Sequence, residues 1–166
     1  KAASQDYAPA QSNLVVRYYY GEGVKQDYLK AKEWFEKAVS KGNTIAEYNL
    51  GLIYDNGYDV KQNYKKAIQF FEKAATKGMA EAQYNLGNMY VNGYGVKQDY
   101  KKAKEWWMKA AKQDLAAAKL NLGVMYSNGY GVKQDKKVAK RWYGEACDGG
   151  EQMGCDNYKK LNQKGY

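Results

Sequence analysis

The reactive side chains of this sequence offer few of the combinations that enzymes use. Its 166 residues include no histidine, which removes the commonest general base and the commonest metal ligand. None of its four serines has a lysine three residues later, as the Ser-x-x-Lys pattern of serine hydrolases requires. Two cysteines, Cys147 and Cys155, are too few for a four-ligand zinc site. The sequence therefore predicts no catalytic centre, no metal site and no cofactor.

A glycine-rich octet, NGYGVKQD, stands at residues 92–99 and again at residues 128–135. Near-copies occupy residues 20–27 and 56–63. Glycine-rich loops can cradle phosphate when they follow a strand and open a helix. Here no strand is expected before the octet, and its glycines lack that motif's spacing. Four equivalent copies favour a structural turn.

The octets belong to a repeat with a period of 36 residues. One of its columns contains Leu14, Leu50, Leu86 and Leu122. A fixed period between 20 and 50 residues is typical of stacked structural units. We therefore divide the chain into one domain of four repeats, residues 8–43, 44–79, 80–115 and 116–151, with a cap at residues 152–166.

Each repeat has the pattern of two helices joined by a tight turn. In the third repeat, Ala82, Leu86 and Tyr90 recur on one face of the predicted first helix. Gly93 is expected to end that helix, because glycine tolerates a positive φ. The predicted N-caps of the second helices are Asp27, Asn63, Asp99 and Asp135. Such pairs bury their apolar faces by stacking on one another.

At these residues the chain resembles the Sel-one-like repeat (SLR) family, which is related to tetratricopeptide repeats. The matching pattern is A-x-A-x-Y-N-L-G-x-x-Y-x-x-G-x-G-V-x-Q-D followed by K-A-x-x-W-x-x-K-A-A, and residues 80–111 fit it nearly throughout. The resemblance covers almost the whole chain. It implies an all-α fold, a right-handed α-solenoid with a concave groove, and a binding role. Departures at Val15, Asp59 and Lys136 predict local variation.

The resemblance also implies which residues line the groove. The asparagine of N-L-G faces the groove in tetratricopeptide-like proteins, where its amide can donate to and accept from a peptide. Hydrogen bonding between repeats is the alternative. Columns that vary are expected to set specificity, and their tyrosines are either binding anchors or core filling between first helices. The predicted groove residues are Tyr48, Asn49, Asp55, Tyr84, Asn85, Asn88 and Asn121.

The two cysteines flank Gly149 and Gly150 near the predicted cap. A helix–turn–helix there could bring Cys147 and Cys155 together, and a bridge would stabilise the fold by about 2–3 kcal/mol. The pair resembles that of the cysteine-rich secreted SLR proteins, in which a late cysteine of one repeat pairs with an early one of the next. Two buried free thiols are the alternative. A disulfide predicts the periplasm or the cell exterior, whereas free thiols suit the cytoplasm.

The net charge of +9, from 27 basic and 18 acidic residues, favours an acidic partner. Nucleic-acid binding requires basic residues interleaved with exposed aromatic residues. Because the repeat pattern places most aromatic residues in the core, we expect no nucleic-acid partner. Tyr58, Tyr94 and Tyr130 in the loops are expected to cover the next repeat, with a surface rim as the alternative. No apolar run approaches the roughly 20 residues of a membrane helix.

The first residues, Lys1-Ala2-Ala3, align with the end of a second helix at Lys73-Ala74-Ala75. We therefore expect residues 1–7 to be the tail of a truncated upstream repeat.

The sequence as a whole predicts a monomeric, non-enzymatic scaffold that binds a protein or peptide in its groove, in the bacterial envelope or outside the cell. An envelope regulator, a host-protein binder and a toxin-immunity protein all fit. The alternative is a penicillin-binding or β-lactamase-like hydrolase, an activity described for some SLR proteins, which the missing Ser-x-x-Lys pattern disfavours.

Overall fold

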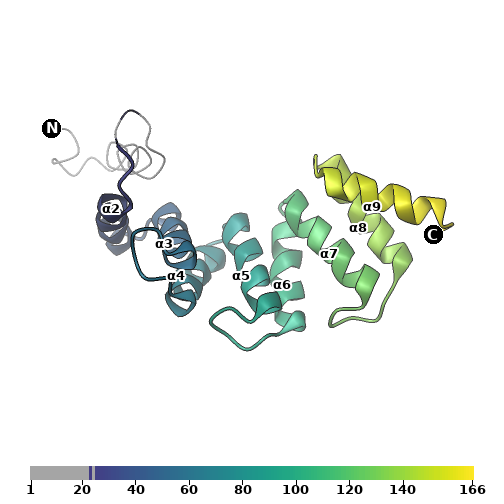
Figure 1. Cartoon of the computed structure of the whole chain (residues 1–166), viewed down its shortest axis with the longest axis horizontal. Helices are drawn as coiled ribbons and strands as arrows, with labels where there is room; N and C mark the ends of the chain where they lie inside the picture. The colour runs from purple at the N-terminus through teal and green to yellow at the C-terminus, as the bar shows by residue number, and fades with distance from the viewer. Residues whose placement is uncertain (1–22, 24) are drawn as a thin grey trace. The chain divides into compact units, whose positions relative to one another are not determined.

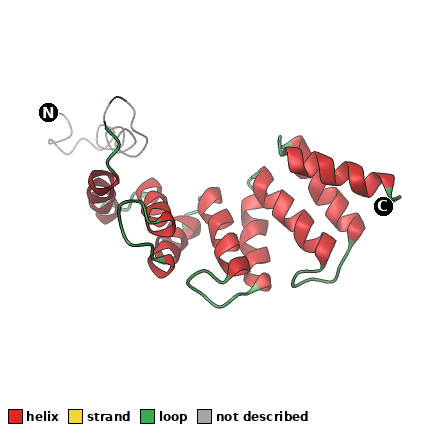
Figure 2. Ribbon diagram, viewed as in Figure 1, coloured by secondary structure: helices red, strands yellow, loops and turns green. Residues whose placement is uncertain are grey.

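The computed structural model describes residue 23 and residues 25–166. Over these residues the chain forms helices and no strand (Figures 1 and 2). The helices are α2 (Tyr28–Ser40), α3 (Thr44–Asn56), α4 (Tyr64–Thr76), α5 (Ala80–Asn92), α6 (Tyr100–Ala111), α7 (Ala116–Asn128), α8 (Lys136–Asp148) and α9 (Gln152–Gln163). The predicted all-α solenoid class is confirmed. Residues 1–7 and the expected first helix of the first repeat, with Val15, lie outside the described residues.

The helices form two compact units that meet in the sequence between Lys77 and Gly78. The first unit contains α2, α3 and α4, and the second contains α5 to α9. In the second unit each helix packs on the next one along the chain, and α7 also contacts α9 (Figure 1). This unit therefore holds two complete helix pairs, α5–α6 and α7–α8, and a closing helix.

The residues that begin the second helices act as the sequence predicts. The side chains of Asp27, Asn63, Asp99 and Asp135 each accept a backbone N–H bond from the first turn of the following helix. At α6, for example, the Lys102 N–H donates to Asp99 Oδ1 over 2.9 Å. Each such cap typically stabilises a helix by about 1 kcal/mol.

The glycines of the octets set the turn within each repeat. Gly93 ends α5 with φ +70°, and Gly95 repeats this left-handed conformation two residues later with φ +70°. In the second repeat Asp59 takes the place of that later glycine and has φ +51°. Aspartate enters this region more readily than most residues, so the loop keeps its course and the departure stays local.

Each complete helix pair interlocks at the glycine of the N-L-G motif. A Cβ atom at Gly87 would lie 2.2 Å from Trp107 Nε1, and this nitrogen donates to the Tyr84 carbonyl oxygen over 3.2 Å. Gly51 against Phe71 and Gly123 against Tyr143 repeat the arrangement, with nearest distances of 2.5 Å. The glycine is needed because an aromatic ring of the second helix packs directly on the backbone of the first.

Helix α9 covers the end of the second unit. Leu161 is buried in a cluster with Leu120 and Tyr143, and the helix begins after Glu151, as the sequence predicts. A disulfide joins Cys147 of α8 to Cys155 of α9, with 4.6 Å between their Cα atoms. The cap is therefore held by apolar packing and by a covalent link.

Candidate partner-binding site

Two predicted groove residues from adjacent first helices meet in the second unit. The Asn121 side chain of α7 donates from Nδ2 to Oδ1 of Asn88 on α5, over 3.1 Å, and the contact is partly buried. This is a hydrogen bond between repeats. It uses neither the Asn88 NH₂ group nor the Asn121 side-chain oxygen, and a primary amide can serve several partners at once. The pair can therefore support the fold and still bind a ligand.

The asparagine pair lines a hollow of about 250 Å³, which we call the amide hollow. Its other lining side chains are mostly apolar or aromatic: Val91, Val124, Met125, Trp107, Tyr100 and Tyr130, together with Asn92. Sites for small molecules usually measure roughly 300–1,000 Å³. A hollow of this size and composition is better suited to one apolar side chain.

A second hollow, of about 720 Å³, adjoins the first at Tyr100, which lines both. We call it the basic hollow, because Lys97, Lys101 and Lys102 line it and Asp99 is its single acidic lining residue. Asp99 is engaged as the cap of α6. The basic hollow therefore carries an excess of positive charge.

Two tyrosines that were not among the predicted groove residues form the rim of the amide hollow. The Tyr130 ring stacks on Tyr100 with centroids 5.7 Å apart, and Tyr130 is 48% exposed. Tyr58 stacks in the same way on Tyr28, at 4.6 Å. For Tyr130 the prediction that the loop tyrosine covers the next repeat is wrong, because its stacking partner belongs to the preceding repeat.

The absence of a side chain at Gly131 explains this direction. A Cβ atom there would lie 2.3 Å from Tyr100 Cβ, so the loop presses back onto the preceding repeat. The signal in the sequence was a pair of tyrosine columns 30 residues apart, Tyr28 with Tyr58 and Tyr100 with Tyr130.

The other predicted groove residues of the second unit are Tyr84 and Asn85. Both are half-buried on α5. Tyr84 packs against the core cluster that contains Trp107 and Leu122, which is the core-filling role considered as the alternative. Neither residue lines the amide hollow.

In the first unit, the structure places the predicted groove residues on α3. Asn49 donates from Nδ2 to the Ile45 carbonyl oxygen of its own helix, over 2.8 Å. The ring of Tyr48 lies 5.9 Å from that of Phe71, and burial raises the pKa of the Asp55 carboxyl group. All three residues lie on this one helix.

One serine meets a lysine without the Ser-x-x-Lys spacing. Lys136 Nζ lies 3.0 Å from Ser127 Oγ and 2.6 Å from the Ser127 carbonyl oxygen. Ser127 is only 9% exposed, and it lines neither of the two hollows. The pair satisfies buried polar groups at the end of α7 and is a structural contact.

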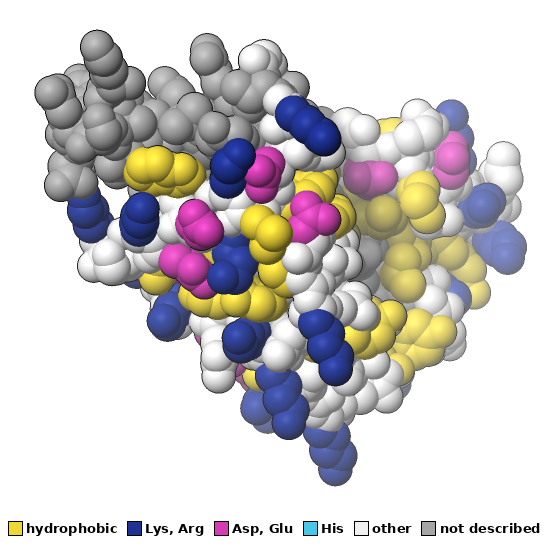
Figure 3. All heavy atoms as spheres, turned by 60° about the vertical axis from the view of Figure 1, so that its left-hand side comes forward, with side chains coloured by type: hydrophobic (Ala, Val, Ile, Leu, Met, Phe, Trp, Pro, Cys, Tyr) yellow, Lys and Arg dark blue, Asp and Glu magenta, His cyan; other side chains and the backbone are white. Residues whose placement is uncertain are grey.

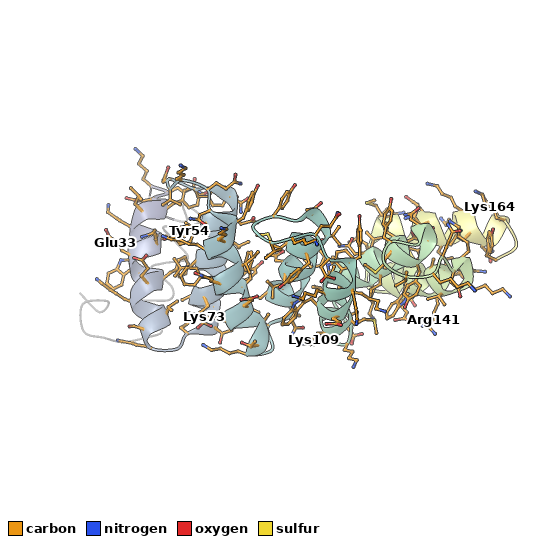
Figure 4. All side chains as sticks on the ribbon, turned by 90° about the horizontal axis from the view of Figure 1, so that it is seen from below. Glu33, Tyr54, Lys73, Lys109, Arg141 and Lys164 are labelled. Carbon is orange, nitrogen blue, oxygen red and sulfur yellow. A yellow bond between two sulfur atoms is a disulfide. The ribbon has the colours of Figure 1, made fainter. Side chains whose placement is uncertain are left out.

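Basic side chains on the second helices cover aromatic rings. Lys109 Nζ lies 4.0 Å from the centroid of the Trp106 ring, and the Arg141 guanidinium lies 5.6 Å from that of Trp142. Figure 4 shows Lys109 and Arg141 projecting outward from α6 and α8. These rings are therefore engaged by cations from their own helices and do not form an open stacking surface.

The four repeats match the model of the Sel1 repeat at residues 8–43, 44–79, 80–115 and 116–151. The chain belongs to the Sel1 repeat family. Sel1 repeats are typical of scaffolds for protein–protein interaction. A search of curated proteins finds no match.

Solved structures of Sel1 repeat proteins resemble this one closely. A protective antigen of uropathogenic Escherichia coli with an SLR fold is 38% identical with a TM-score of 0.94, over 99% of this chain and 35% of the antigen. A Sel1 repeat protein from Oxalobacter formigenes is 31% identical with a TM-score of 0.89, over 96% of this chain and 65% of that one. This Sel1 repeat chain thus spans about a third of the first relative and about two thirds of the second.

The cysteine-rich protein B of Helicobacter pylori is also similar. It is 26% identical with a TM-score of 0.58, over 75% of this chain and 95% of that protein. Within the described part of this Sel1 repeat chain, no helix is long and apolar enough to cross a membrane. The same residues contain no cluster of three or more potential metal ligands among His, Cys, Asp and Glu.

Proposed function

We propose that this Sel1 repeat protein is a non-enzymatic scaffold that binds a protein or peptide partner through its first helices. The observation that carries the proposal is the half-buried contact between Asn88 and Asn121. It places free amide hydrogen-bonding groups in a hollow whose other walls are largely apolar. Backbone groups of a peptide require such donors and acceptors when they leave water.

We propose further that the partner is acidic and that the scaffold works as a monomer. The chain has a net charge of +9, and complementary charge speeds association and disfavours wrong partners. On the face shown in Figure 3, dark-blue Lys and Arg side chains are spread among apolar ones. An envelope regulator, a host-protein binder and a toxin-immunity protein all fit this description.

We propose that the protein works in the bacterial periplasm or outside the cell. The disulfide between Cys147 and Cys155 supports this location, since such bonds persist in oxidising compartments and are rare in the cytosol. The measurement is the thiol content of protein purified from its native host under alkylating conditions. Free thiols would contradict the proposed location.

The binding function is tested by using the chain as bait on a native cell-envelope extract. We expect one stoichiometric partner, retained by the wild type and lost when Asn88 and Asn121 are both changed to alanine. The matched control changes Asn56 and Asn128 to alanine, because these side chains donate only within their own helices. Equal retention by both double variants, or retention of no protein, would contradict the proposed site.

A further inference from the structure

We propose that the amide hollow and the basic hollow together bind one peptide segment, in which an aliphatic side chain lies next to an aspartate or glutamate. This inference rests on the proposed scaffold function and names the chemistry of the partner. It uses residues of the second unit alone, from Asn88 on α5 to Gly131 in the loop after α7.

The amide hollow selects for an aliphatic side chain through its size and its walls. Its 250 Å³ are bounded by Val91, Val124, Met125 and Trp107, apart from the asparagines and the rim. Burying an aliphatic side chain against such walls is favourable in proportion to the apolar area removed from water. A charged side chain there would lose its hydration without a charged partner.

The amide pair adds a requirement for the backbone of the same segment. Of the groups that remain outside their mutual bond, the Asn88 NH₂ group can donate to a peptide carbonyl and the Asn121 oxygen can accept from a peptide N–H. An apolar small molecule would leave both groups unpaired, at a cost in affinity. The hollow therefore favours a polypeptide over a hydrocarbon ligand.

The basic hollow places the acidic residue. Tyr100 lines both hollows, so the two sites lie within the width of one side chain. In an extended peptide, residues i and i+2 lie on one face at about 3.3 Å rise per residue. A carboxylate two positions from the aliphatic residue can therefore reach Lys97 and Lys101, which are both exposed.

The same features disfavour a nucleic acid as the ligand. Tyr100 and Tyr130 stack on each other, so each ring has one face already occupied, whereas single-stranded nucleic acids bind aromatic faces that are open to bases. Both hollows are free of arginine, the residue suited to bidentate recognition of phosphate.

The second unit has an amide hollow between α5 and α7. At the equivalent place between α7 and α9, side chains of the cap helix fill the space. Leu120 is buried, and Val124 is partly buried, against the cluster that contains Leu161 of α9. Lys136 stands where the third repeat has the rim residue Tyr100, and its side chain is hydrogen-bonded to Ser127. The cap therefore leaves one such site in this unit.

The test is a selection of random twelve-residue peptides displayed on phage against the whole chain. We expect enriched peptides to carry Leu, Ile, Val or Met within two residues of Asp or Glu. Synthetic copies should bind the Lys97→Glu/Lys101→Glu variant at least about tenfold more weakly. The matched control, Lys112→Glu/Lys159→Glu, changes two exposed lysines of the same unit that line neither hollow and should bind normally.

A second variant separates the two parts of the proposal. Val91→Phe partly fills the amide hollow and should abolish the preference for an aliphatic residue while keeping the preference for acidic ones. Circular dichroism and thermal melting establish that each variant is folded. The inference would be overturned if the enriched peptides lacked the acidic residue, or if they bound Lys97→Glu/Lys101→Glu and Val91→Phe as tightly as the wild type. Either result would leave the scaffold function standing.

Two further outcomes also overturn the inference. One is the absence of any enriched peptide. The other is tight, competing binding of a twelve-nucleotide oligothymidine that is lost in Lys97→Glu/Lys101→Glu, which would assign the basic hollow to nucleic acid. The bait experiment with Asn88 and Asn121 would then decide separately whether the scaffold function holds.

Discussion

The third and fourth repeats share the octet NGYGVKQD letter for letter, yet they present different surfaces. In the third, Tyr100 begins α6 and helps to form two hollows. In the fourth, Lys136 holds that position and binds the buried Ser127, which stands where the third repeat has Val91. An identical turn therefore does not fix the surface beside it, because residues that flank the octet differ between the two repeats.

A second exchange occurs at the other end of the helix pairs. In the third repeat Gln113 Nε2 donates to Gln83 and to the Gly78 carbonyl oxygen, over 2.9 Å in both cases. The second repeat uses a charged version of this contact, in which Lys77 binds Glu47 and the Gly42 carbonyl oxygen. The corresponding residue of the fourth repeat is Gly149, and there Lys119 pairs with Asp114 instead, over 2.8 Å.

The largest expected effect tests what the two repeats share. Gly87→Ala and Gly123→Ala should each lower the free energy of unfolding by about 2–3 kcal/mol, because the new methyl group meets the ring of Trp107 or Tyr143. This outweighs the roughly 0.5–1 kcal/mol that alanine gains over glycine in a helix. Urea denaturation followed by circular dichroism measures both variants.

Gly144→Ala is the matched control for these glycines. It also lies inside a helix, but a Cβ atom there would be 3.4 Å from the Tyr158 ring, which is close to an ordinary contact. We expect this variant to be as stable as the wild type or slightly more stable. If Gly87→Ala behaved like Gly144→Ala, the interlocking of helix and ring would not depend on glycine.

The next effect tests whether residues 127 and 136 exchange as a pair. Lys136→Met removes the hydrogen bonds to Ser127 and should cost about 1–2 kcal/mol, since it leaves a buried hydroxyl and carbonyl with fewer partners. Ser127→Val/Lys136→Tyr restores the residue pair of the third repeat. It should cost less than the sum of its two single changes, by about 1 kcal/mol. Additive effects in a double-mutant cycle would show that the two positions vary independently.

The sequence predicted the helices of this protein well because the same helix pattern recurs in every repeat. The N-caps, the left-handed glycines and the start of the cap helix depend on local sequence, and the structure has them where they were expected. Periodicity also predicted the face of Ala82, Leu86 and Tyr90 on α5, and all three residues are buried.

The candidate site was less accessible to sequence reasoning because it depends on contacts between repeats. The sequence named Asn88 and Asn121 and offered hydrogen bonding between repeats as one role of the N-L-G asparagine, but it did not identify the two as partners, which lie 33 positions apart. It also assigned Tyr130 to the wrong neighbour, since the backward course of the loop follows from close packing at Gly131. The contact between Ser127 and Lys136 was not predicted, because it joins residues nine positions apart on either side of the octet and follows no fixed motif.

The smallest expected effect depends on pH and distinguishes Tyr143 from Trp107, its counterpart in the third repeat. Burial raises the pKa of Tyr143 above the ordinary value of 10.0, and a hydrogen bond with Ser127 partly offsets the rise. Above about pH 10 the unfolded chain therefore loses this proton while the folded chain still holds it. The unfolded state then binds fewer protons, so stability falls as pH rises, whereas below pH 10 the contribution is fully present.

Tyr143→Phe removes this ionisation. The difference in unfolding free energy between the wild type and Tyr143→Phe should be constant from about pH 7 to pH 9 and should shift against the wild type above about pH 10. Trp107→Phe is the control, because tryptophan carries no group that titrates in this range, and its difference from the wild type should stay constant throughout. A parallel shift in both variants would assign the pH dependence to the other tyrosines and lysines of the chain, and the fourth repeat would then not differ from the third in this respect.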